Sequence, residues 1–72
     1  MRPFNLLEAL AGENIITRNG EEVILTNFEI GELYPLRGII IGSAPRIASW
    51  TSEGCYSMMT NFSPNDIFMK ED

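Results

Sequence analysis

The spacing of apolar positions changes at Gly12, and this change divides the chain into a helical start and an extended remainder. Leucine and alanine, which are strong helix formers, fill most of residues 6–11. Asn5 is a good N-cap, Glu8 stands at the capping-box spacing, and Gly12 suits the left-handed residue that ends a helix. We predict a helix over residues 5–11, about two turns long. It must dock on another element, because so short a helix is unstable alone.

The segment just after this helix is rich in β-branched residues and predicts a first hairpin. Residues 14–18 and residues 21–27 have the composition of two strands. Asn19-Gly20 between them is a strong hairpin signal, since both residue types tolerate the positive φ of a type I′ turn. These two strands are therefore expected to be antiparallel neighbours.

Three further strands are expected, separated by turn-forming residues. Residues 28–36 are interpreted as a loop, because they contain a glycine and a proline that interrupt regular structure. The strands are predicted at residues 37–42, 46–51 and 55–59. The isoleucines of residues 37–42 indicate a strand buried on both faces. Ser52-Glu53-Gly54 is typical of a hairpin loop with a glycine bulge.

The end of the chain carries a second helix-start pattern. Ser63 is an N-cap, Pro64 suits the first helical position, and Asp66 favours the positive helix end. We expect residues 67–69 to form one helical turn folded back onto the sheet, and residues 70–72 to fray.

These elements predict a mainly β (α+β) fold in one domain, residues 1–72. The five strands are short and joined by tight turns, so the sheet is expected to be mostly antiparallel. Two arrangements remain open. The sheet curls into a small SH3-like or OB-like barrel with the first helix plugging one end, or it stays an open meander with the helix across one face.

The length and the cysteine count limit how such a fold is stabilised. A 72-residue domain is marginal as a monomer and has only Cys55, so it has no intrachain disulfide. Without histidine, a metal site would consist of carboxylates alone, and no calcium-loop motif is present. We therefore expect no metal or cofactor, and a homo-oligomer.

The apolar runs and the net charge of the chain argue against two classes of partner, membranes and nucleic acids. No signal peptide is visible and the longest apolar run, residues 39–41, is too short for a bilayer, so we expect a cytoplasmic protein without membrane association. The net charge of −5 argues against direct nucleic-acid binding. Most acidic residues precede Arg37; they either suit a basic partner surface or form a solvated face.

The residue inventory argues against catalysis. The absence of histidine excludes histidine-dependent triads and dyads. Nothing near Cys55 in sequence would activate its thiol as a nucleophile, so we interpret it as a small buried hydrophobic residue. No phosphate-binding glycine loop occurs. We predict that the protein is not an enzyme and has no catalytic residues.

Binding is better supported, and five residues are candidates: Arg18, Tyr34, Arg46, Trp50 and Tyr56. Arg46 and Trp50 are expected on one side of their strand, where an aromatic ring beside a guanidinium would stack on a base and contact a phosphate. In the alternative interpretation, Trp50 fills the core and the stem of Arg46 covers it.

Several short motifs, in order along almost the whole chain, resemble a family of small tailed-phage and prophage proteins with no established function. They are Pro3-Phe4-Asn5-Leu6, Ala9-Leu10-Ala11-Gly12, Ile16-Thr17-Arg18-Asn19-Gly20 with Val23, Tyr34-Pro35-Leu36, Ser49-Trp50-Thr51 with Gly54 and Tyr56, and Asn65-Asp66-Ile67-Phe68-Met69. Family members commonly carry Asp where this chain has Asn5 and Asn19, and Lys-Asp-Gly in place of Ser52-Glu53-Gly54. The resemblance implies a phage origin and a host-cytoplasm location, and it brings no catalytic residues.

Three functions are hypotheses at this point. The first is a binding protein that counters host defence, either by docking on a host protein or by sequestering a small nucleotide signal. The second is an acidic nucleic-acid mimic that inhibits a host DNA- or RNA-binding enzyme. The third is a structural or accessory phage protein.

Overall fold

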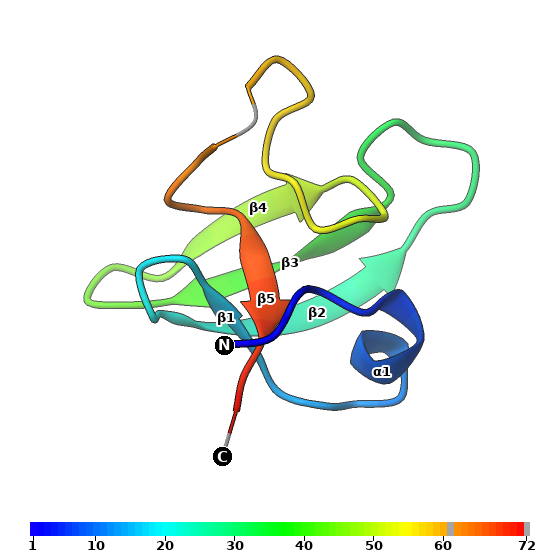
Figure 1. Ribbon diagram of the computed structural model, residues 1–72. Helices are drawn as coiled ribbons and strands as arrows, with labels where there is room; N and C mark the ends of the chain where they lie inside the picture. The colour runs from blue at the N-terminus through cyan, green and yellow to red at the C-terminus, as the bar shows by residue number, and fades with distance from the viewer. Residues whose placement is uncertain (61, 72) are drawn as a thin grey trace.

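The computed structural model describes residues 1–60 and 62–71 and shows one curled antiparallel sheet with a short helix beside it (Figure 1). The elements, in chain order, are α1 (Leu6–Leu10), β1 (Ile15–Thr17), β2 (Glu22–Phe28), β3 (Leu36–Ile41), β4 (Arg46–Trp50) and β5 (Ile67–Met69). The strand order across the sheet is β4-β3-β2-β1-β5. The predicted mainly β class, with five antiparallel strands, is confirmed; the sheet is a half-barrel, between the two arrangements left open.

The inner, concave side of the sheet holds the core. Trp50, Leu36, Ile40 and Met69 have no exposed surface, and Ile15, Val23 and Ile67 join them. Because side chains alternate along a strand, each of these strands contributes every second residue to this side. The core therefore collects residues from both ends of the chain.

The start of α1 is as the sequence predicts. The side chain of Asn5 accepts a hydrogen bond of 3.0 Å from the Glu8 N–H, and Gly12 has a φ of 98°. The Glu8 carboxylate does not complete the capping box; it accepts from Arg2 at 3.0 Å instead. Only one face docks, with Ala9 buried against the core while Leu7 points to solvent.

The first hairpin forms, but its turn differs from the expected type I′ turn. No described residue other than glycine has a positive φ, so Asn19 does not adopt the conformation that a type I′ turn requires. The Thr17 backbone N–H donates to the Glu21 carbonyl, and the Thr17 carbonyl accepts from the Gly20 N–H. Gly20 has a φ of 85°. The loop therefore spans residues 18–20, one residue more than predicted, and places Arg18 outside the strand.

The fifth strand is not where the sequence predicts it. The helical turn expected at residues 67–69 is wrong: these residues form β5 and pair antiparallel with β1, with Ile15 opposite Met69. The alternation of buried Ile67, half-buried Phe68 and buried Met69 has the period of a strand, and burial of two large side chains outweighs the weak start signal. Lys70, expected to fray, donates its N–H to the Asn14 carbonyl at 3.0 Å, and Asp72 lies outside the described residues.

The strand predicted at residues 55–59 does not form. Its backbone N–H groups bond to side chains instead of to β4: Tyr56 donates to Asp66, Met58 to the Tyr34 hydroxyl and Met59 to the Ser57 hydroxyl. The glycine-bulge loop before it is confirmed, with Gly54 at a φ of 90° donating to the Thr51 carbonyl.

β3 is buried on one face only, against the expectation of two. Ile40 points into the core, whereas Ile39 is half-buried and Ile41 is 40% exposed on the convex side. Among the described residues, α1 lies on the concave side and no element covers the convex side of β2–β4 (Figure 1). The isoleucine run therefore supplies both a core residue and an open surface.

Candidate functional site

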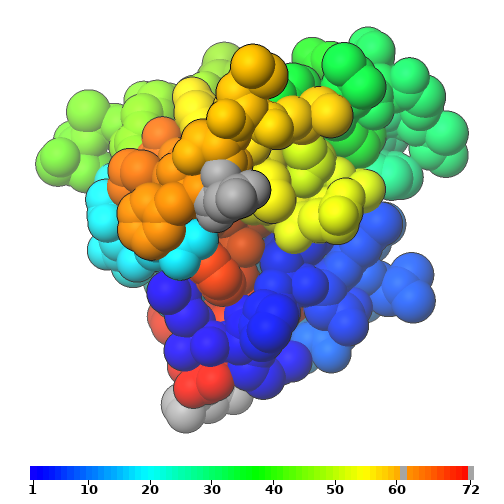
Figure 2. All heavy atoms as spheres, turned by 45° about the horizontal axis from the view of Figure 1, so that its top comes forward, coloured from blue at the N-terminus to red at the C-terminus, as the bar shows by residue number. Residues whose placement is uncertain are grey.

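The longer first turn directs Arg18 toward the far end of the chain. Its Nη2 donates to Asp66 Oδ2 at 3.0 Å and its Nε donates to the Ser63 carbonyl at 3.1 Å. Its backbone N–H donates to the Asp66 carbonyl at 2.9 Å. Figure 2 shows the turn and the segment around residue 66 in contact, in cyan and orange.

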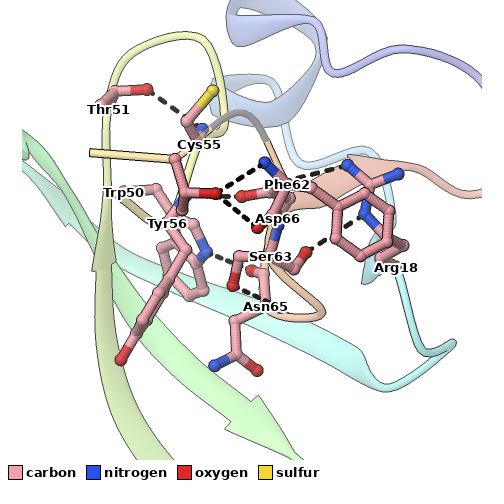
Figure 3. A network of polar contacts seen from close by, with 10 residues as sticks. Arg18, Trp50, Thr51, Cys55, Tyr56, Phe62, Ser63, Asn65 and Asp66 are labelled. Carbon is pink, nitrogen blue, oxygen red and sulfur yellow. Dashed lines mark hydrogen bonds and ion pairs between the residues drawn. The ribbon is translucent and has the colours of Figure 1, made fainter. Parts of the chain in front are cut away.

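Asp66 is the centre of this polar network (Figure 3). Its Oδ1 accepts from the Tyr56 N–H at 2.8 Å, and its Oδ2 accepts from the Ser63 N–H at 3.0 Å as well as from Arg18. Burial opposes ionisation of the 7%-exposed residue. The donors from Tyr56, Arg18 and Ser63 outweigh burial, so the pKa of Asp66 lies below its usual range.

Two aromatic rings flank the Arg18 guanidinium. Its carbon lies 4.1 Å from the centre of the Phe62 ring and 4.7 Å from that of Phe68. Both distances are within the range of a cation–π contact. With an ion pair and two rings occupying it, Arg18 joins β1, β5 and the 51–66 segment, and its head group is not free for a ligand.

Arg46 is engaged in a similar way at the start of β4. Its two terminal nitrogens donate to the two Glu21 carboxylate oxygens at 3.2 and 2.9 Å, and Nη2 also donates to the Asn65 side chain at 3.1 Å. The hydrogen bond from Arg46 lowers the pKa of Glu21.

Trp50 belongs to the core. Its side chain has no exposed surface, and its Nε1 donates to the Asn65 carbonyl at 2.7 Å. Arg46 and Trp50 do share the concave side of β4, as expected, but they meet through Asn65 rather than at an open pocket. This geometry matches the alternative in which Trp50 is structural.

Tyr34 and Tyr56 are the two candidates that line an open groove. They line a shallow groove along β4 together with Ile47, Ala48, Ser49 and Ser57. The Tyr34 hydroxyl accepts from the Met58 N–H at 3.0 Å and so holds the far wall of the groove. Cys55, which precedes Tyr56, is half-buried, whereas the sequence analysis expected it to be fully buried.

The protein's basic side chains are all committed to its own carboxylates. The six pairs of the five basic residues are Arg2–Glu8, Arg18–Asp66, Arg37–Glu29, Arg37–Glu32, Arg46–Glu21 and Lys70–Glu22. The Arg37 contacts are the longest of these, at 3.8 and 3.7 Å. Neither carboxylate is hydrogen-bonded to Arg37, and its buried Nε has no hydrogen-bond partner among the described residues, so Arg37 is the most weakly held of the five cations. Glu13 and Glu53 have no ion pair among the described residues.

A surface that sequence reasoning missed lies on the convex side of the sheet. Ile24 and Ile47 are each opposite Ile39 across a strand pair, and Ile41 extends the row along β3. Ile47 is 86% exposed and Ile24 is 55% exposed. We call Ile24, Ile39, Ile41 and Ile47 the isoleucine face. The apolar runs at residues 23–25 and 39–41 were the only sequence signal for it, and they do not say which side chains are exposed.

Neither a metal site nor a membrane-spanning helix is found among residues 1–60 and 62–71. Those residues contain no group of three or more carboxylate or cysteine ligands placed to hold a metal ion. Within the same ranges, no helix has the length and apolar character needed to span a bilayer. Comparison with protein-family models, with curated proteins and with solved structures finds no match to this chain.

Proposed function

We propose that this is a non-catalytic, phage-encoded binding protein that counters host defence by docking on a host protein. The isoleucine face carries the docking part of the proposal. Soluble domains seldom leave cross-strand rows of large apolar side chains uncovered unless another molecule covers them. The phage origin and the host-cytoplasm location rest on the sequence resemblance.

The other versions of this role have less support. Sequestering a nucleotide requires a free cation, and Arg18 and Arg46 both hold carboxylates of the protein itself. Mimicry of nucleic acid requires uncompensated carboxylates, yet Glu21 and Glu22 pair with Arg46 and Lys70. If the protein has an accessory phage role, it should be present in purified virions, and mass spectrometry of virions would test this.

The test is capture of the host partner by wild-type and variant proteins. Tagged protein is cross-linked in infected cells, and the captured proteins are identified by mass spectrometry. The variant Ile24→Lys with Ile47→Lys places two charges on the isoleucine face and is expected to lose the partner. The variant Leu7→Lys with Ile30→Lys makes the same charge change at exposed positions elsewhere and should retain it.

Equal capture by both double variants would refute docking through this face. Self-association stays a separate prediction of the small size of the chain, and light scattering of the wild type measures it directly.

A further inference from the structure

The outer edge of β4 has unpaired backbone groups. Thr51 uses its N–H and C=O in the turn that comes after β4, on the side away from β3. Because backbone groups alternate in direction along a strand, Ser49 and Ile47 direct theirs to the same outer side. Among the described residues, no backbone hydrogen bond from outside the strands reaches them.

The segment that would have covered this edge turns away from it. After Cys55 the chain rises from the sheet, as Figure 1 shows in yellow. Tyr56 then bonds to Asp66 and Met58 bonds to Tyr34, which fixes the segment at a distance from β4. The shallow groove between Tyr56 and the edge is what this separation leaves.

The two edge strands of the sheet, β5 and β4, differ in whether their outer backbone groups are paired. At β5, the backbone of Met69 exchanges hydrogen bonds of 3.1 and 3.0 Å with Arg2, so that edge is covered. At β4, the 86%-exposed Ile47 lies in the middle of an open edge, and the proline that precedes the strand, Pro45, blocks pairing only at its start. Only Arg46, at the start, carries a charge, and Glu21 neutralises it.

The charge of the molecule indicates what would pair there. The net charge is −5, and every lysine and arginine is already paired with a carboxylate. Glu32 lines an adjoining hollow that shares Tyr34 and Ser49 with the groove, and there it is paired with Arg37. Glu53, in the turn after β4, has no ion pair among the described residues. A basic segment is attracted to this surface, whereas a second copy of the chain is repelled at long range.

We propose that the edge of β4 takes up an extended segment of the partner protein, with apolar residues alternating with lysine or arginine, as a sixth strand. Backbone hydrogen bonds to Ile47 and Ser49 would hold the segment, and its alternate side chains would lie on the two sides of the sheet. This inference rests on the proposed function and names the chemistry of the partner.

The test is a titration of ¹⁵N-labelled protein with a capped six-residue peptide of alternating lysine and valine. We expect saturable shifts centred on the Ile47 and Ser49 amides. A peptide of alternating glutamate and valine, and a lysine–valine peptide N-methylated at every residue, should each bind at least tenfold more weakly. The first control removes the charge match and the second removes the backbone donors.

Two protein variants locate the binding. Ser49→Pro removes an outward N–H and leaves the β3 ladder intact, so it should weaken binding about tenfold; its fold is checked by the unchanged amide spectrum of β1 and β5. Ile47→Lys should weaken binding of the basic peptide, and Ile47→Glu should not, which gives a second comparison if Ser49→Pro fails to fold.

Three results would overturn the inference: no shift at the β4 amides, equal binding of the N-methylated peptide, or concentration-dependent shifts at Ile47 and Ser49 without peptide, which would place a second copy on the edge. If Ser49→Pro captures the host partner normally while Ile24→Lys with Ile47→Lys does not, docking through the isoleucine face stands and the added strand is rejected.

Discussion

At the scale of single residues, the side chain of Asp66 makes more hydrogen bonds than the side chain of any aromatic candidate. It is a buried carboxylate that joins three segments through Arg18, Tyr56 and Ser63. Both acceptor positions of Oδ2 are used, and Oδ1, which accepts once, is buried with the rest of the side chain. A lowered carboxyl pKa at such a position indicates a structural ion pair rather than an acid–base catalyst.

Replacing Asp66→Asn is expected to lower the free energy of unfolding by about 2 kcal/mol, since it removes the ion pair and puts an NH2 group where a donor already points. The folded-state pKa of Asp66 lies below the unfolded value of about 3.9. The carboxylate therefore contributes its full stability above that pH and loses it as the pH falls through the folded-state pKa. Urea unfolding of both proteins from pH 7 to pH 2 measures the difference, which should shrink below about pH 4.

Glu53→Gln is the matched control, because Glu53 is exposed and without an ion pair among the described residues. Its effect should stay within about 0.5 kcal/mol at every pH. A difference between wild type and Asp66→Asn that grows toward low pH would contradict the assignment.

At the scale of elements, the same turn occurs twice. In Thr17–Glu21 and in Thr51–Cys55, a buried threonine pairs with the residue four positions later, and its hydroxyl accepts from that residue's N–H. A glycine with positive φ closes each loop, at 85° and 90°. The Thr51–Cys55 turn directs the chain after β4 away from the sheet. The Thr17–Glu21 turn contains Arg18, which bonds to Ser63 and Asp66 in that later segment.

The two turn glycines are expected to differ in their tolerance of alanine. Gly20→Ala meets open space and should cost about 1–2 kcal/mol, from the backbone conformation alone. At Gly54, the added methyl would also lie 2.9 Å from Phe4 and 3.0 Å from the Ile67 carbonyl. Gly54→Ala should therefore cost about 1–3 kcal/mol more. Chemical denaturation of the two variants provides the comparison, and equal losses would show that the packing around Gly54 is loose.

Local signals predicted the elements whose partners are nearby in sequence. Asn5 begins α1 and Gly12 follows its end, each through local backbone geometry, so the sequence was sufficient to predict this helix. Ser63 and Asp66 do form a turn, but burial of residues 67–69 against β1 makes the next segment a strand rather than a helix. A three-residue apolar run has no readable period, so its strand pairing was not predictable.

The candidate site was predictable only in part, for a similar reason. Arg18 and Asp66 are 48 positions apart, and no local pattern reports that they meet. Tyr34 and Tyr56, chosen as binding residue types, line the groove, whereas the choice between core and surface for Trp50 depended on how the sheet curls. The isoleucine face was missed because an isoleucine run fits either single-sided or two-sided burial.

At the scale of the whole molecule, apolar surface and charge are arranged in opposition. The isoleucine face is open, while every basic side chain is held by an acidic one and the excess charge is negative. Charge repulsion is thus the main protection of this face against non-specific association.

Solubility should therefore be lowest near the isoelectric point of about 4.5. Ile24→Lys with Ile47→Lys and Leu7→Lys with Ile30→Lys raise the isoelectric point equally, but only the first removes apolar surface from the isoleucine face. We expect the first variant to remain dissolved at its own isoelectric point at concentrations that precipitate the second. Turbidity between pH 4 and pH 7 tests this, and equal precipitation would mean that the face does not drive association.

The pairing of β5 with β1 has a consequence for how the protein is made. Ile67 and Met69 complete a core whose other members, including Trp50 and Ile15, are synthesised earlier. A nascent chain that has emerged only as far as β4 has a free β1 edge and an uncovered tryptophan. Such a chain offers both to any neighbouring polypeptide, so the interval before residues 67–69 leave the ribosome is when misassembly or chaperone capture is most favoured.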